Sequence, residues 1–336
     1  MIRAWAPGRV NLIGDHTDYT EGLVLPMAID LGTTVEVQLE GEVVRLRSDH
    51  QPEEAVVPLD IEEPRCVEPP WARYVAGVVA ELRPTIGARG TVTTDLPIGA
   101  GLSSSSSLQV ALARALGFDG DAPSVAKLCQ RAEQRAAGVP CGIMDQLAIA
   151  AGVDGALLFI DCESLEVLVE YLPEDLAVVG VHSGVQRDLR TTPYTTRRAE
   201  CAAVEREIGP LRHASLETVK SISDPVARRR ARHVVTENAR VVAFVQALRQ
   251  ARYVDAGELM TKNNSLRDDF AVSTPVVDNL VAQLQATPGV FGARMTGGGF
   301  GGIVVALCDA GADVQASVGG TRFRPSTGVT VEVTSG

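Results

Sequence analysis

The chain has 336 residues, of which 45% are apolar and 22% are charged, so its length and composition predict a globular protein of two domains. No apolar run approaches the length of a membrane span, and the N-terminus lacks the apolar core of a signal peptide, which predicts a cytoplasmic protein. A net charge of −11 disfavours nucleic acid as a partner, because binding to phosphates needs a basic face. The six cysteines form no C-x-x-C pair, and we expect buried thiols at Cys129, Cys201 and Cys308.

Polar side chains crowd the first stretch, Ala6–Tyr19, which reads APGRVNLIGDHTDY. Carboxylates accept hydrogen bonds from hydroxyl groups and histidine can donate or accept them, so this cluster suits a polyhydroxylated ligand. The alternative is an ordinary turn with aspartate caps and a surface histidine. The apolar residues 23–29 predict a core strand beside the cluster, and the alternation over 33–39 predicts a half-exposed strand.

Residues 48–70 are rich in proline and glutamate and show little periodicity, which predicts a surface excursion. Residues 71–82 follow as a predicted helix. Trp71 at its start is either part of the core or rim, or a stacking surface for a purine.

A glycine- and serine-rich loop, LPIGAGLSSSSS at 96–107, lies between a predicted strand at 90–94 and a predicted helix at 108–116 that ends at Gly117. Bare backbone N–H groups and a helix N-terminus together form an anion site suited to phosphate, and serine hydroxyls can bind Mg²⁺. The alternative, a flexible linker, is disfavoured because an amphipathic helix follows at once. The loop matches neither the Walker A motif nor the Rossmann fingerprint.

Two acidic residues beyond this loop are candidates for chemistry. A helix predicted over 124–137, with Ser124 as its N-cap, carries Glu133 at the border of its apolar face. Glu133 is either a solvated side chain or a metal ligand. Asp145 lies near the start of a short helix ending at Gly152, either as a favourable first-turn acid or as a catalytic carboxylate.

The chain changes character near Glu174. A strand is predicted at 176–181, and a long helical pattern over 224–252 begins at Asp224-Pro225 and carries the basic run 228–232, which we expect to be a solvated face. Another helix begins at Thr274-Pro275. A second glycine loop at 296–302 leads into a strand at 303–308, which favours backbone contact over flexibility, and a strand at 329–333 closes the chain.

Three stretches, APGRVNLIGDHTDY, LPIGAGLSSSSS and MTGGGFGG, resemble in this order the motifs of the GHMP small-molecule kinases, and the first is similar to the galactokinase signature. The resemblance covers nearly the whole chain. It implies an α/β (two-layer α+β) GHMP kinase fold with a ribosomal S5 domain 2-like N-terminal domain and a ferredoxin-like C-terminal domain. We expect the first domain at 1–175, with the sugar motif and phosphate loop, and the second at 176–336, with the glycine loop.

The resemblance also implies roles for individual residues. The catalytic pair would be Arg9 and Asp145. The sugar would be lined by Asp15, His16, Thr17, Asp18, Gly142 and Tyr194. The nucleotide would be bound by Trp71, Gly99, Ala100, Gly101, Leu102, Ser103, Ser104 and Ser105. Ser105 and Glu133 would bind Mg²⁺.

The implied activity is the ATP-dependent phosphorylation of the anomeric hydroxyl of D-galactose, with ATP and Mg²⁺ required and the enzyme a monomer. Asp15 replaces the glutamate usual in the family, which leaves open a related hexose, amino sugar or pentose as the substrate. A non-catalytic sugar and ATP sensor is a third hypothesis, which the presence of both Arg9 and Asp145 disfavours.

Overall fold

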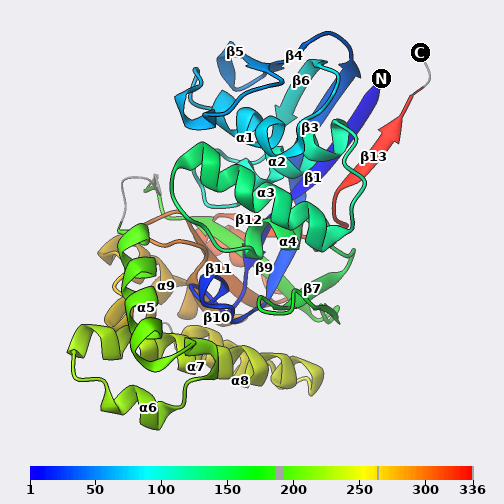
Figure 1. Cartoon of the computed structure of the whole chain (residues 1–336). Coiled ribbons are helices and arrows are strands. Elements are labelled where there is room, and N and C mark those ends of the chain that lie inside the picture. The colour runs from blue at the N-terminus through cyan, green and yellow to red at the C-terminus, as the bar shows by residue number, and fades with distance from the viewer. Residues whose placement is uncertain (186–192, 263–264, 335–336) are drawn as a thin grey trace.

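A six-stranded sheet forms the N-terminal half (Figure 1). The computed structural model describes residues 1–185, 193–262 and 265–334. The strands in spatial order are β13 (Thr330–Val333), β1 (Ile2–Asn11), β3 (Pro26–Leu39), β6 (Ala88–Thr94), β4 (Val43–Ser48) and β5 (Gln51–Pro58). Neighbours are antiparallel except β4 and β6. The last strand of the chain therefore pairs with the first, and both ends lie in this half.

Helices cover one face of this sheet (Figure 1). They are α1 (Ala72–Leu82), α2 (Ser104–Ala115), α3 (Ala122–Ala137) and α4 (Met144–Ala151). Every position of α2 from Ser106 to Ala115, except Arg114, is buried, because the helix packs on the sheet and also against its three neighbours. A helix that is buried on nearly all sides fixes its own N-terminus firmly, and this is the end that the glycine–serine loop reaches.

The C-terminal half is built on a second sheet, with the strand order β10 (Val290–Met295), β11 (Ile303–Asp309), β9 (Leu176–His182) and β12 (Thr321–Phe323). In β9, Leu176 and Val178 pack into a core shared with the N-terminal half, whereas Ala177 and Val179 pack toward the helices. Successive side chains of a strand point to opposite faces, so a continuous apolar run is required here.

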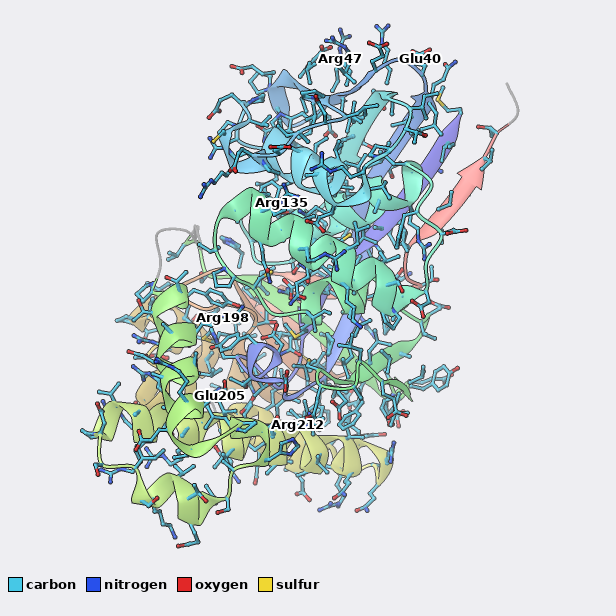
Figure 2. All side chains as sticks on the ribbon, viewed as in Figure 1. Glu40, Arg47, Arg135, Arg198, Glu205 and Arg212 are labelled. Carbon is cyan, nitrogen blue, oxygen red and sulfur yellow. The ribbon has the colours of Figure 1, made fainter. Side chains whose placement is uncertain are left out.

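Helices of this half are α5 (Tyr194–Ile208), α6 (Leu216–Ser221), α7 (Pro225–Arg249), α8 (Tyr253–Thr261), α9 (Pro275–Gln285) and α10 (Val314–Val318). Short turns are η1 (Asp18–Thr20), η2 (Pro64–Cys66), η3 (Leu211–His213) and η4 (Ser265–Asp269). A small third sheet consists of β2 (Leu23–Val24), β7 (Ala156–Asp161) and β8 (Val167–Tyr171). Arg212 on η3 forms an ion pair with Asp161 on β7, which joins the helices to this sheet (Figure 2).

Three sequence predictions are wrong. Residues 51–58, part of the predicted surface excursion of low periodicity, form strand β5, which pairs with β4. The N-cap of α3 is Asp121, whose side chain accepts from the backbone N–H of Ser124, so the helix begins earlier than predicted. The basic run is not simply a solvated face, because Arg230 is buried and donates to Glu200 at 2.7 Å.

Other predictions are confirmed. The helices that begin at Asp224-Pro225 and Thr274-Pro275 have those caps, with both side chains accepting from first-turn N–H groups. Cys129, Cys201 and Cys308 are buried, and all six cysteines are free thiols. Within the described ranges, no helix is both long enough and apolar enough to cross a membrane.

Candidate active site

A cavity of about 600 Å³ is lined by residues of both halves. It receives side chains from β1, the first polar motif, the glycine–serine loop, α1, α3, α4 and α5, together with the second glycine loop. Segments separated by hundreds of residues in the sequence therefore meet at one place.

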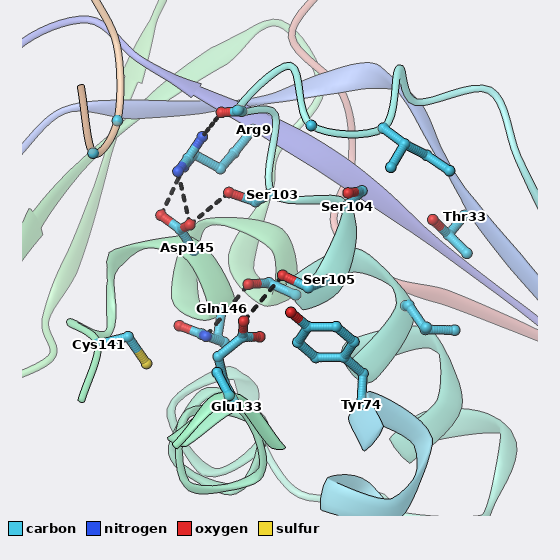
Figure 3. Close-up of a pocket in the computed structure, with 18 of the residues that line it drawn as sticks. Arg9, Thr33, Tyr74, Ser103, Ser104, Ser105, Glu133, Cys141, Asp145 and Gln146 are labelled. Carbon is cyan, nitrogen blue, oxygen red and sulfur yellow. Dashed lines mark hydrogen bonds and ion pairs between the residues drawn. The ribbon is translucent and has the colours of Figure 1, made fainter. Parts of the chain in front are cut away.

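Arg9 and Asp145 form a two-pronged ion pair in this cavity (Figure 3). Nε of Arg9 donates to Oδ1 of Asp145 at 2.7 Å, and Nη2 donates to Oδ2 at 2.7 Å. Nη1 donates to the carbonyl of Gly101 at 2.8 Å, and Ser103 donates to Oδ2 of Asp145 at 2.5 Å. The fork of a guanidinium fixes a carboxylate in orientation as well as position, so the pair is rigidly aimed.

The glycine–serine loop presents its backbone to the cavity. Gly99 and Gly101 adopt positive φ angles of +75° and +88°, which glycine adopts without a steric penalty. Ala100 and Leu102 are buried in the core beneath the loop and do not line the cavity, so their predicted contribution is limited to the backbone. The first N–H groups of α2 lack partners within the helix, and they begin where Ser103 and Ser104 line the cavity.

Glu133 on α3 faces the same end of α2. Its Oε1 accepts from the hydroxyl of Ser105 at 3.1 Å (Figure 3). Burial raises the pKa of Glu133 to about 7, against the hydrogen bond from Ser105 and with a further contribution from Asp145. Nowhere in the described residues do three or more His, Cys, Asp or Glu side chains gather as a metal cage. Two hard oxygen atoms beside a helix N-terminus would suit Mg²⁺, which keeps several waters and can share its coordination with phosphate oxygens.

Besides Arg9, the first polar motif supplies three cavity-lining residues, Asp15, His16 and Asp18. His16 has a φ of +64°, and its ring lies 5.6 Å from Tyr194, which also lines the cavity. The surface-histidine alternative is therefore wrong, since His16 is buried. Thr17 does not line the cavity, because it is buried and donates to the carbonyls at positions 14 and 23.

Gly142 lies directly against Asp18. A Cβ atom added at Gly142 would lie 1.6 Å from Oδ2 of Asp18, so any larger residue would displace the Asp18 carboxylate. Burial, together with the nearby charge of Asp145, raises the pKa of Asp18 to about 6. The carbonyl of Cys141 accepts from Arg198 on α5 at 2.8 Å, which attaches α5 to the loop between α3 and α4; Arg198 is labelled in Figure 2.

The opposite end of the cavity is lined by Trp71 and Tyr74 of α1 and by the turn between β4 and β5. Trp71 donates from its indole nitrogen to the carbonyl of Glu53 at 3.0 Å, which fixes the ring against this hairpin. Sequence reasoning missed His50 and Gln51, because the hairpin itself was not predicted. For Tyr74 a signal existed, since it stands one helical turn after Trp71.

Sequence reasoning also missed Arg294 and Glu237, which are linked by ion pairs to Asp15 of the first polar motif. Asp15 forms an ion pair with Arg294 at 2.8 Å, and Arg294 also pairs with Glu237 of α7 at 2.7 Å. All three side chains are buried. The sequence did contain a signal for both, because each is a charged residue within an apolar pattern. Arg294 lies within the strand 290–295, and Glu237 lies within the helix that begins at 225.

Comparison with known proteins agrees with this geometry. The galactokinase galactose-binding signature matches residues 2–39, and the GHMP kinase N-terminal and C-terminal domains match 73–153 and 244–321. Human galactokinase is 43% identical over 94% of this chain and 87% of its own length. Galactokinase from Haemophilus influenzae strain PittGG is 41% identical over 91% of this chain and 85% of its own length.

Solved structures that resemble this chain include a galactokinase and a mevalonate kinase. The galactokinase of Lactococcus lactis in complex with galactose superposes with a TM-score of 0.90 at 30% identity, covering 98% of this chain and 95% of its own. The mevalonate kinase of Methanococcus jannaschii shares the fold alone, with a TM-score of 0.70 at 20% identity over 97% of this chain and 98% of its own. The polar motif, the phosphate loop and the second glycine loop that meet in one cavity are therefore those of a known family, and the chain belongs to the galactokinases of the GHMP kinase family.

Proposed function

We propose that this chain transfers the γ-phosphoryl group of ATP to the anomeric hydroxyl of D-galactose, giving galactose 1-phosphate and ADP. The observation that carries the proposal is the position of the Arg9–Asp145 pair, which lies in one cavity with the sugar motif and the phosphate loop. Phosphoryl transfer depends mainly on positioning and on neutralising charge, and both are supplied here by side chains held in place by the fold.

In the proposed reaction the anomeric oxygen attacks the γ-phosphorus while the bond to the β-phosphate oxygen breaks. Asp145 accepts the hydrogen bond of the attacking hydroxyl and orients it or takes its proton. Arg9 carries a permanent positive charge that holds Asp145 and faces the charge developing on the transferred group. The hydrogen bond from Arg9 to the Gly101 carbonyl supports this role, because it ties the pair to the loop that would bind the phosphates.

We assign the nucleotide to the other part of the cavity. The backbone of 99–105 and the start of α2 would bind the phosphates, with Trp71 beside the adenine. Ser105 and Glu133 would hold Mg²⁺, and their proximity to each other and to α2 supports this assignment. The ion, when bound, neutralises charge on the phosphate oxygens.

We assign the sugar to the motif side of the cavity, between Asp15, His16, Asp18, Gly142 and Tyr194. Two carboxylates, an imidazole and a phenol surround a space that only a polar, hydroxyl-rich ligand can satisfy. All residues assigned to the site come from one chain, which supports a monomeric enzyme. Six free thiols fit the reducing cytoplasm, to which we assign the protein.

The test is an ADP-release assay with ATP and a panel of monosaccharides. We expect galactose to exceed glucose, N-acetylgalactosamine and arabinose in kcat/KM. Another sugar that exceeds galactose tenfold, about 1.4 kcal/mol of transition-state binding, would overturn the assignment of galactose. Binding of sugar and ATP with no turnover for any sugar would overturn the assignment as an enzyme.

A further inference from the structure

Arg294 occupies an unusual place for a charged residue. It lies on β10 between the buried residues Ala293 and Met295, and its own side chain is 1% exposed. It does not line the cavity, whereas its partner Asp15 does. An ionised side chain in the interior is costly unless it is paired, so the pairing must define its role.

Glu237 holds the guanidinium of Arg294 from the other side. Its Oε1 accepts from Arg294 at 2.7 Å and from the N–H of Gly14 at 2.9 Å, and its Oε2 accepts from Arg240 at 2.8 Å. Burial opposes the ionisation of Glu237, but the charges of Arg294 and Arg240 outweigh it and hold its pKa well below the ordinary value. Glu237 is therefore an anion that fixes Arg294 next to the sugar motif.

The two carboxylate oxygens of Asp15 have different partners. Its Oδ1 accepts from Asn11 at 3.1 Å and from the N–H of Gly297 at 3.0 Å. Its Oδ2 lies 2.8 Å from Arg294, yet it accepts no well-aligned hydrogen bond from any described residue. Asp15 is one of the residues that line the cavity, and a carboxylate oxygen without such a bond keeps the capacity to accept one from a hydroxyl group of a bound molecule.

The charge of Arg294 also acts on the ionisation of Asp15. Burial and Glu237 raise the pKa of Asp15, and Arg294 is the principal group that opposes them. Without Arg294, two buried carboxylates would remain near each other with less positive charge between them. The ionised form of Asp15, which can accept on both oxygens, would then be less favoured.

We propose that Arg294 is a positioning residue of the sugar site: its ion pair keeps the Asp15 carboxylate aimed at one hydroxyl of the sugar, and so sets part of the sugar specificity. The inference rests on the proposed function, because it concerns the sugar bound in that same cavity. Arg294 would contribute to the discrimination between sugars although it contacts neither the substrate nor the reacting atoms.

The experiment uses galactose and the four galactoses that each lack one hydroxyl, at position 2, 3, 4 or 6. We measure kcat/KM for each sugar with the parent enzyme, with Arg294→Gln and Arg294→Lys, and with Asp15→Asn. For the parent, removal of the hydroxyl held by Asp15 should lower kcat/KM at least tenfold relative to galactose. In Arg294→Gln the ratio of kcat/KM for galactose to kcat/KM for this one deoxy sugar should fall to threefold or less. The same ratios for the other three deoxy sugars, and the KM for ATP, should stay within twofold of the parent values. Arg294→Lys, which keeps the charge, should retain more of the ratio.

A matched control is available in Arg212, which also pairs with two carboxylates, Asp161 and Glu163, outside the cavity. Arg212→Gln should leave all four ratios unchanged. The double variant that combines Arg294→Gln with Asp15→Asn should show no further loss at the affected position, because both changes remove the same interaction. If Arg294→Gln does not fold, Glu237→Gln should reduce the same ratio, since Glu237 acts through Arg294.

Several results would overturn the inference. These are an equal loss for all sugars in the Arg294 and Glu237 variants, multiplied effects in the double variant, or unchanged ratios in Asp15→Asn. A parent enzyme that does not phosphorylate galactose at all would instead overturn the proposed function, so the two failures are distinguishable.

Discussion

Replacing Asp145 by asparagine removes a charge at nearly constant volume. The carboxylate accepts three hydrogen bonds, two from Arg9 and one from Ser103. An amide can accept on only one side, and its NH₂ group would face donors on the other. At least one charge-assisted hydrogen bond is lost, at a cost of about 1.5–3 kcal/mol, and Arg9, which is 3% exposed, loses its counter-charge.

The effect on turnover should be larger than the effect on binding. If Asp145 orients the attacking hydroxyl or takes its proton, kcat should fall about a hundredfold or more, equivalent to about 2.7 kcal/mol of barrier, with a small change in the KM for ATP. The assay is steady-state ADP release, with thermal unfolding measured in parallel. Asp154→Asn, at an exposed position, serves as the control. Turnover of Asp145→Asn within threefold of the parent would refute the assignment.

Three further outcomes are expected. Glu133→Gln should raise the Mg²⁺ concentration needed for half-maximal activity, because a hard cation prefers an anionic oxygen, and an unchanged requirement would mean that Glu133 is no ligand. Gly142→Ala places a Cβ 1.6 Å from an oxygen of Asp18, so the KM for galactose should rise at least tenfold with little change for ATP; steady-state kinetics that find both unchanged would contradict the site geometry. Burial lowers the pKa of His233 to about 4 from an ordinary value near 6.5, so the folded state resists protonation and the free energy of unfolding should fall by up to about 3 kcal/mol as the pH drops from 6.5 to 4. Urea unfolding of His233→Gln should lack this part of the decline, and an equal decline in parent and variant would refute it.

The parts of the fold that the sequence predicts well are those with strong local signals. Helix α7 begins where an aspartate cap precedes a proline, and the glycine–serine loop lies between a β-branched strand and an apolar helical face. These signals depend on nearest neighbours along the chain, so no tertiary information is needed. The strand β5 was missed because its two prolines and its two glutamates hide the alternation, and only pairing with β4 defines it.

The candidate site divides in the same way. Arg9 and Asp145 are identified by motif, but the two-pronged geometry between β1 and α4 requires the folded chain. Asp15 and Arg294 form an ion pair although they lie 279 positions apart in the sequence. No periodic pattern in the sequence indicates which two charged residues are buried next to each other. The sequence also cannot distinguish Thr17, which stabilises its own turn, from its neighbours that line the cavity.

The most direct test of the central claim identifies the atom that is phosphorylated. Galactose labelled with ¹³C at the anomeric carbon is incubated with ATP, Mg²⁺ and the enzyme, and the product is observed by ¹³C and ³¹P NMR, with Asp145→Asn as the background. We expect the labelled carbon signal to be split by coupling to phosphorus and ADP to form in equal amount. A phosphorus resonance with no coupling to the labelled carbon, or ADP formed without a sugar phosphate, would contradict the claim.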